Sequence, residues 1–365
     1  MQINEIIAFL ESKAPLQLQE HYDNCGLLTG NPNQVCSGVL VCLDVTEKVI
    51  FEAQHKGCNL IVAHHPLIFE GIKKITTNSE TGRILIAAIK SEIAIYAIHT
   101  NLDNLVTGVN NYMARKIGLQ GLSALTTPKG LLRKLITFVP AGHLQQVQKA
   151  LFDSGAGQIG QYSECSFVSS GTGSFKPENG ATPFSGTIGT RSEEPEEKLE
   201  VIFPHWVESG VIQALKKTHP YEEVAFDLLT LNNDYQHVGS GLMGKLQQPL
   251  SEEAFLLHVK EQFNLKVIRH SPFLKNPIET VAICGGSGSF LIRHALAQKA
   301  DAFITSDVKY HSFFETENRL LIADIGHWES EQFTIDLLFD WLTQKFPTFA
   351  VLKTEVVTNP VRYFL

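Results

Sequence analysis

The sequence predicts an α/β protein whose core is formed by two separate stretches of chain and interrupted by a smaller α+β unit. Short apolar runs alternate with helical segments over the first third of the chain, which is typical of a sheet with covering helices. This alternation breaks near 126–128 and resumes after residue 233. The segment between has the order strand, helix, strand, repeated once, which is the ferredoxin-like arrangement. We therefore predict a core at 1–126 and 233–365 and an insert at 127–232.

The first part of the core alternates strands and helices. Its strands are expected over 39–43, 59–63 and 93–98, and its helices over 47–55, 81–90 and 109–117. Gly57 and Gly118 follow two of these helices, and glycine commonly ends a helix. The strands are short, apolar and rich in β-branched residues, so we expect them to be buried on both faces of a sheet.

The insert contains two strand–helix–strand units. Its strands are expected over 131–140, 199–203 and 224–229, and its helices over 143–153 and 207–218. Residues 169–175 are mostly serine and glycine, so we expect a loop there, and an acidic stretch follows over 192–197. The motif His219-Pro220-Tyr221-Glu222-Glu223 contains metal-binding residue types, but we recognise no partner cluster within the insert and interpret it as a structural or intersubunit turn.

The second part of the core returns to the first pattern. Its strands are expected over 281–284, 302–305 and 320–326, and its helices over 255–262, 291–298 and 331–345. Glycine and serine residues at 285–289 connect the first of these strands to a helix. Such a connection can bind an anion through backbone N–H groups, and we name Gly286, Ser287 and Gly288 as candidates for that role. A tight turn is the alternative, because the loop matches neither phosphate-binding consensus.

Histidines and carboxylates occur directly after three of the predicted strands. His64 and His65 follow the run 59–63, the segment His99 to Asp103 follows 93–98, and the segment His327 to Glu331 follows 320–326. Ligands of α/β sheets bind beyond the carboxyl ends of the strands, so these residues are placed for chemistry. Neighbouring side chains of a regular strand point to opposite faces. Pro66 interrupts the strand and allows both adjacent rings to converge.

Imidazole and carboxylate side chains are typical ligands of zinc, manganese, iron and nickel. Cysteine is absent from these positions, which argues against a closed structural zinc site. Five ligands exceed the four of a typical structural site, and hydrolytic enzymes often use two metals that share a water. His327 and Glu331 are four residues apart and would share one helix face. We expect Glu331 rather than Asp103 to bridge two ions, since it lies beside His327.

These motifs together resemble one known family. Asp23 to Leu27, His64-His65-Pro66, His99 to Asp103, Thr305-Ser306-Asp307 with His311, and Gly326-His327 with Glu331 look like the signature motifs of the type-2 homologues of GTP cyclohydrolase I, the NIF-three-like dinuclear metal-centre proteins. The resemblance extends over essentially the whole chain. One departure is Ser306, where members often have glycine.

The resemblance implies a site, an assembly and a substrate class. It implies two divalent ions, of which zinc is our first expectation, bound by His64, His65, Asp103, His327 and Glu331. It also implies an insert similar to the PII-signalling and CutA-like fold, and a ring-shaped homohexamer that trimers of the insert would help to build. A small, nucleotide-like substrate is implied by the family name, although no guanine-binding element can be picked out from the sequence.

Several other residues have two interpretations. Asp307 and His311 could transfer protons in the reaction, or Asp307 could cap the following helix. His99 could be a sixth ligand, or it could donate a hydrogen bond to a ligating carboxylate. Asp23 could orient a histidine or form an ordinary turn with Asn24.

Composition limits the class of protein. The 365 residues carry a formal net charge of −8 and no basic stretch interleaved with aromatic residues, which disfavours nucleic acid as a partner. No apolar run reaches the roughly 18 residues that a membrane helix requires. The 6 cysteines show no CxxC spacing, and no apolar signal segment follows Met1, so we expect a cytoplasmic protein with reduced thiols. We expect a metal-dependent hydrolase; the alternative is a non-catalytic hexamer for metal binding, regulation or trafficking.

Overall fold

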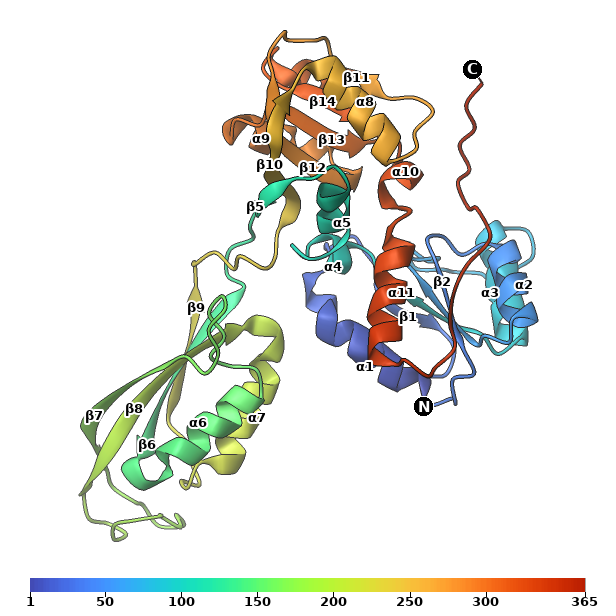
Figure 1. Cartoon of the computed structure of the whole chain (residues 1–365). Coiled ribbons are helices and arrows are strands. Elements are labelled where there is room, and N and C mark those ends of the chain that lie inside the picture. The colour runs from blue at the N-terminus through green and yellow to red at the C-terminus, as the bar shows by residue number, and fades with distance from the viewer. Residues whose placement is uncertain (365) are drawn as a thin grey trace. The chain divides into compact units, whose positions relative to one another are not determined.

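The chain folds into three β-sheets with helices packed on their faces, which confirms the α/β class expected from the sequence (Figure 1). The computed structural model describes residues 1–364. It divides into two compact units, which we call the core and the insert. The core comprises Met1–Thr127 and the chain from His237 onward, and the insert is Pro128–Gln236.

The first sheet of the core is mainly parallel and buried. Its strands are, in spatial order, β1 (Gly26–Thr29), β4 (Ala94–Ala97), β3 (Leu60–Ala63), β2 (Val39–Cys42) and β15 (Val351–Lys353). Only β1 is antiparallel to its neighbour. Every residue of β2, β3 and β4 is buried, because helices cover both faces of the sheet.

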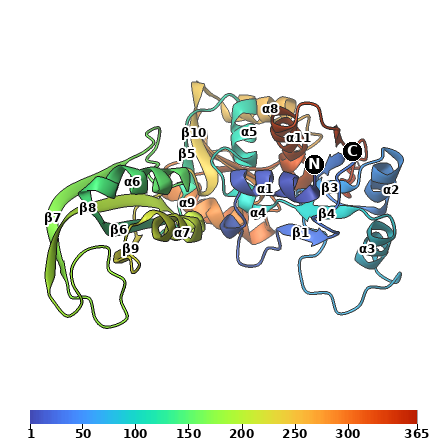
Figure 2. The same ribbon diagram turned by 90° about the horizontal axis from the view of Figure 1, so that it is seen from below.

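The helices of this sheet lie in two pairs (Figures 1 and 2). On one face α2 (Glu47–His55) contacts α3 (Glu80–Lys90). On the other, α1 (Ile3–Lys13) and α11 (Thr334–Lys345) meet where Phe9 packs edge-on against Phe346. The side chains of Thr46 and Ser79 cap the N-termini of α2 and α3 by accepting backbone N–H bonds.

The second sheet of the core combines three parallel strands with antiparallel edges. Its strands are, in spatial order, β11 (Arg269–His270), β14 (Leu321–Asp324), β13 (Ala302–Ser306), β12 (Ile278–Ser287), β10 (Ser240–Leu250) and β5 (Gln120–Thr126). Residues of α5 (Val109–Lys116) and α8 (Glu252–Gln262) share one apolar cluster with this sheet, and residues of α9 (Ile292–Ala297) share another.

The insert is ferredoxin-like. Its elements follow the order β6 (Leu132–Pro140), α6 (Leu144–Asp153), β7 (Ser166–Phe175), β8 (Ser192–Pro204), α7 (Glu208–Thr218) and β9 (Phe226–Leu231). The strands form an antiparallel sheet in the order β7-β8-β6-β9. One apolar cluster joins α6 and α7 to alternate residues of β6 and β8, including Leu135 and Leu199.

One sequence-based expectation is wrong, and another is shifted at its start. Residues 169–175 belong to β7 and pair with β8 from Ser166 to Phe175, so cross-strand pairing overrides the loop preference of a serine- and glycine-rich segment. The helix expected over 331–345 is confirmed as α11 but begins three residues later, at Thr334, because Glu331 belongs to the short helix α10 (His327–Glu331). Glu331 therefore lies at the last position of α10, on the same short helix as His327.

The parallel strands of both core sheets end near the same place. The chain leaves β3 at His64, β4 at the turn before α4 (Thr100–Asp103), and β14 at the turn before α10. Both α5 and α10 contact β12. Among residues 1–364, no helix is both long and apolar enough to cross a membrane.

Candidate metal centre

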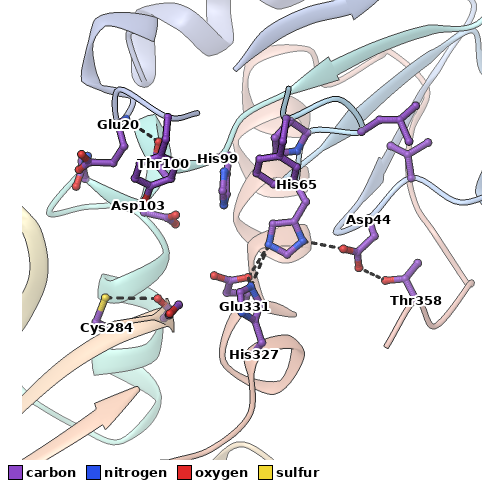
Figure 3. A pocket seen from close by; sticks show the side chains of 18 of the residues that line it. Glu20, Asp44, His65, His99, Thr100, Asp103, Cys284, His327, Glu331 and Thr358 are labelled. Carbon is purple, nitrogen blue, oxygen red and sulfur yellow. Dashed lines mark hydrogen bonds and ion pairs between the residues drawn. The ribbon is translucent and has the colours of Figure 1, made fainter. Parts of the chain in front are cut away.

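Histidines from two strand ends surround the carboxylate of Glu331: His64 and His65 follow β3, and His327 follows β14 (Figure 3). The Nε2 atoms of His65 and His327 lie 2.8 and 3.0 Å from Glu331 Oε2. The two Nε2 atoms are 3.4 Å apart. Glu331 is 2% exposed, so its charge depends on these neighbours rather than on water.

The other oxygen of Glu331 faces a second set of donors. His64 Nε2 lies 4.0 Å from Glu331 Oε1 and 3.6 Å from Asp103 Oδ1. Both distances are too long for a hydrogen bond. The His64 ring is fully buried, and its Nε2 has no hydrogen-bond partner among the described residues. A buried nitrogen without a partner costs free energy unless something else binds it.

The opposite nitrogen of each ring is held by an oxygen acceptor. The Nδ1–H groups of His64 and His65 donate to the Ile98 carbonyl at 2.8 Å and to Asp44 at 2.7 Å. His327 Nδ1–H donates to Asp307 at 2.6 Å. These bonds leave Nε2 of every ring directed at the carboxylates. The same arrangement orients metal-ligating histidines in known sites.

The donor set fits divalent cations. The groups His65–His327–Glu331 and His64–Asp103–Glu331 each place three ligand atoms within 4.8 Å of one another, and both contain Glu331. Donors that bind one ion at roughly 2.0–2.2 Å lie roughly 3–4 Å apart, which matches the distances around His64. A third group, His64–His65–His99, meets the same distance limit.

Hydrogen bonds around Glu331 oppose the effect of burial on the pKa values of this carboxyl and of two histidines. Burial favours the neutral form of His65, but hydrogen bonds to Asp44 and Glu331 raise its pKa to about 10. The same balance raises the pKa of His327 to about 9, mainly through Glu331. Burial alone would raise the pKa of the Glu331 carboxyl, but hydrogen bonds from His327 and His65 hold it well below its usual range. Both imidazolium rings thus carry a proton on the nitrogen that faces Glu331.

The two remaining ligand candidates behave differently. Burial lowers the pKa of His64 to about 3, so this ring is neutral at pH 7. Burial raises the pKa of Asp103 to about 7. A neutral imidazole beside a poorly solvated carboxylate is a good site for a cation, because neither group has to lose a strong partner when the cation binds.

The glycine segment expected as a loop lies largely within β12, which runs to Ser287, and it packs against Glu331. Gly286 has a φ of +62°, and a Cβ there would lie 2.2 Å from Glu331 Oε1, so only glycine leaves room for this carboxylate. Its N–H donates to the Ser330 hydroxyl, and the N–H of Gly288 donates to the Thr305 hydroxyl, both at 2.9 Å. Those amides are occupied, which favours a packing role. Ser287 lines the cavity described below, so anion binding here stays a prediction.

The candidates for proton transfer are separated in the structure. Asp307 is exposed and bonded to His327, and it does not cap the 3₁₀ helix η5 (Tyr310–Thr316), which follows Lys309. His311 lies on η5, exposed, with its ring against Tyr310. Asp23 orients a histidine, since its carboxylate accepts the Nδ1–H of His99 at 2.9 Å.

A cavity of about 650 Å³ opens over the cluster. His65, His99, Asp103, His327 and Glu331 form part of its wall (Figure 3). Apolar side chains form another part, including Leu67, Ile84, Phe69 and Phe290. Five carboxylates line the cavity, from Glu20, Asp44, Glu80, Asp103 and Glu331, and its described lining contains no lysine or arginine.

Comparison with known proteins agrees with this architecture. A family model described as Duf34/NIF3 (NGG1p interacting factor 3) matches residues 1–360. The chain belongs to the DUF34/NIF3 family. This confirms the resemblance seen in the sequence.

Relatives and solved structures of the DUF34/NIF3 family match most of the chain. A protein of Halalkalibacterium halodurans is 42% identical over 324 residues, covering 88% of this chain and 87% of its own, and one of Bacillus subtilis is 36% identical over 369 residues, covering 98% of each. Both are named "GTP cyclohydrolase 1 type 2 homolog". The crystal structure of a Bacillus cereus protein related to NIF3 is 36% identical, with a TM-score of 0.88, over 100% of this chain and 99% of its own. A Staphylococcus aureus protein structure with 28% identity gives a TM-score of 0.79 over the same shares.

Sequence reasoning missed Asp44 and Thr358. Thr358 Oγ1–H donates to Asp44 Oδ2 at 2.5 Å, and Asp44 in turn holds His65 (Figure 3). Asp44 is the second residue after β2, so it occupies a strand end like the predicted ligands. Its position just after a strand could therefore have identified Asp44 from the sequence. Thr358 is 314 residues away in the sequence and gave none.

Proposed function

We propose that this protein is a metal-dependent hydrolase that binds two divalent ions through His64, His65, Asp103, His327 and Glu331. The observation that carries the proposal is the buried His64 Nε2, which has no partner among the described residues and faces two carboxylates. The two donor groups that share Glu331 support a pair of ions rather than one. Bound there, such ions would supply Lewis acidity toward water and toward a carbonyl or phosphoryl oxygen.

Each side chain has a defined task in this proposal. His65 and His327 would hold an ion through Nε2, while Asp44 and Asp307 fix the orientation of their rings. Glu331 places one oxygen toward each donor group. Zinc is our first expectation, and manganese, iron and nickel suit the same imidazole and carboxylate ligands.

We assign proton transfer to His99 rather than to Asp307 or His311. Burial opposes ionisation of Asp23, but bonds from His99 and Thr100 hold the Asp23 pKa below its usual range. Asp23 is thus a carboxylate that retains the proton on His99 Nδ1, and His99 Nε2 is left to accept a proton in the cavity. Asp307 is engaged with His327, and His311 is not among the residues that line the cavity.

The cavity charge favours a substrate that is not a polyanion. Five carboxylates and no lysine or arginine line the described cavity, so a triphosphate would have only the metal ions as counter-charge. The apolar wall formed by Leu67, Phe69 and Phe290 suits a planar ring. Although relatives are named as GTP cyclohydrolase homologues, we propose a small neutral substrate such as a nucleoside or cyclic amide.

The experiment is turnover by protein reconstituted with each metal. Nucleosides, nucleotides, cyclic amides and phosphodiesters are offered in parallel. Activity that is abolished in the double variant Asp103→Ala, Glu331→Ala supports the hydrolase. Reversible metal release without turnover of any compound favours the metal-trafficking alternative instead.

Light scattering tests the homohexamer that the family resemblance implies.

A further inference from the structure

The insert contains a cavity of its own, about 670 Å³ in volume. It is lined by β7, by the loop at 176–185, by β8 and by the turn at 221–223. Phe138, Glu196 and Lys198 contribute from the face of the sheet opposite α6 and α7, because their neighbours Val139 and Leu199 pack against those helices. This volume is within the range of small-molecule sites.

Aromatic rings form three of the walls. The Tyr221 ring lies between those of Phe175 and Phe184, with centroid distances of 6.3 and 5.9 Å. The interplanar angles are 54° and 49°, so the rings are inclined to one another rather than stacked. Inclined ring faces around a common space are the arrangement that binds ammonium groups through cation–π attraction.

The turn that contains Tyr221 is held in one conformation by His219. The His219 ring is buried. Its Nε2–H group donates to the Phe138 carbonyl at 2.9 Å, and its Nδ1 atom accepts the backbone N–H of Tyr221 at 3.1 Å. The Tyr221 hydroxyl donates to Glu196 at 2.8 Å. The position of the Tyr221 ring is therefore fixed before any ligand binds, which reduces the entropy lost on binding.

The cavity carries an excess of negative charge. Glu178, Glu196, Glu222 and Glu223 line it, against Lys176 and Lys198. Lys176 pairs with Glu178 at 3.4 Å, and Lys198 pairs at 2.6 Å with Glu200, which is outside the lining. Within residues 1–364, no cationic side chain forms an ion pair with the carboxylates of Glu196, Glu222 and Glu223.

Two local features show that the wall around Glu196 is closely packed. The Ser185 hydroxyl oxygen is buried in the wall without a hydrogen-bond partner among the described residues. At Gly173 a Cβ would lie 2.0 Å from Glu196 Oε2, so the glycine leaves space that the carboxylate needs.

We propose that this cavity binds a small organic cation, with its ammonium group against the Phe184 and Tyr221 rings and beside the Glu196 and Glu222 carboxylates. The apolar part of the ligand contacts Phe138 and Phe175. The proposal gives a role to the His219–Glu223 motif that metal binding does not use, and it does not depend on the function proposed for the core.

The test is calorimetric titration of the full chain with probes of one shape and different charge. Phenethylamine is the cation, 2-phenylethanol is the neutral match, and 3-phenylpropanoate is the anion. Benzyltrimethylammonium and spermidine extend the cationic set. We expect amines to bind at least about tenfold more tightly than the alcohol, since cation–π and carboxylate contacts act only on the charge. Binding should weaken as salt rises.

Two variants test whether the ligand binds in this cavity. Glu196→Gln and Phe184→Leu should each weaken phenethylamine binding about tenfold. Phe184 is 53% exposed, so its replacement leaves the apolar cluster of the insert intact. The matched control Glu193→Gln removes the same charge from β8 outside the lining and should stay within about twofold. Failure of every cation to bind, equal affinity for the alcohol, or unchanged binding in both cavity variants would overturn the proposal.

Discussion

His64 in the core and His219 in the insert are both buried histidines, and they differ in how their ring nitrogens are used. Both nitrogens of His219 have backbone partners, the Phe138 carbonyl and the Tyr221 N–H. Only Nδ1 of His64 has a partner, while its Nε2 faces carboxylates at 3.6 and 4.0 Å. His219 is thus a structural residue with its hydrogen-bonding capacity filled, whereas His64 has one donor atom left for a cation. The number of occupied nitrogens separates the two roles better than burial does.

The largest effect is expected at Glu331. Glu331→Gln removes the charge that both donor groups share, so metal affinity should fall by more than about a hundredfold at both positions. Metal content after dialysis, measured by mass spectrometry, checks this. Glu329→Gln is the matched control, because Glu329 lies on the same helix but bonds to Asn359 and Tyr363. If the Glu331 variant retained two ions, the shared-carboxylate assignment would be wrong.

The next effect is on pH dependence. The pKa values of about 10 for His65 and about 9 for His327 mean that both rings carry a proton at pH 7 that a metal ion must displace. Affinity should therefore rise with pH from 7 to about 9 and level off near 10. At pH 7, metal binding should release about two protons per chain from His65 and His327 and about half a proton more from Asp103, whose pKa is about 7. Calorimetry in buffers of different ionisation enthalpy counts these protons. Release of none would contradict the charge coupling around Glu331.

A smaller effect is expected at Asp44. Asp44→Asn weakens the acceptor that holds His65 Nδ1–H, so metal affinity should fall by about tenfold while the fold is kept. Thr358→Val, one contact further away, should have less effect than Asp44→Asn. Competition with a chelator of known affinity measures both variants. If the two variants lost the same metal affinity, Thr358 and Asp44 would not act through the hydrogen bond between Asp44 and His65.

His99→Gln separates a proton carrier from a ligand. Metal content should stay within about twofold of the parent while hydrolysis falls by about a hundredfold or more, as expected for loss of a general base. Parallel loss of metal would instead make His99 a ligand of the group it forms with His64 and His65.

The least effect on metal is expected at His219. His219→Ala leaves the Phe138 carbonyl and the Tyr221 N–H unpaired, which should cost about 1–3 kcal/mol of insert stability. Metal content should not change. Urea unfolding followed alongside metal analysis tests both statements, and metal loss in this variant would break the distinction between the two histidines.

Sequence alone predicted the strand ends but not the contacts across them. His65 and His327 could each be placed at the end of a buried strand. Their strands, β3 and β14, belong to different sheets, so the family resemblance rather than the strand pattern placed the two histidines in one site. Their partners could not be assigned, since Asp44 and Asp307 bind them from 21 and 20 residues away and an imidazole N–H can donate to many kinds of acceptor. The serine- and glycine-rich segment around Ser169 and Gly171 predicts a loop by its composition. That composition gives no sign of the ten-residue pairing with β8.

The most direct test of the central claim is an anomalous difference map from crystals of the protein grown with manganese or zinc. We predict two peaks for each chain, one beside Glu331 Oε2 with His65 and His327, and one beside Oε1 with His64 and Asp103. A single peak away from His64 Nε2, or no peak in this cluster, would contradict the account.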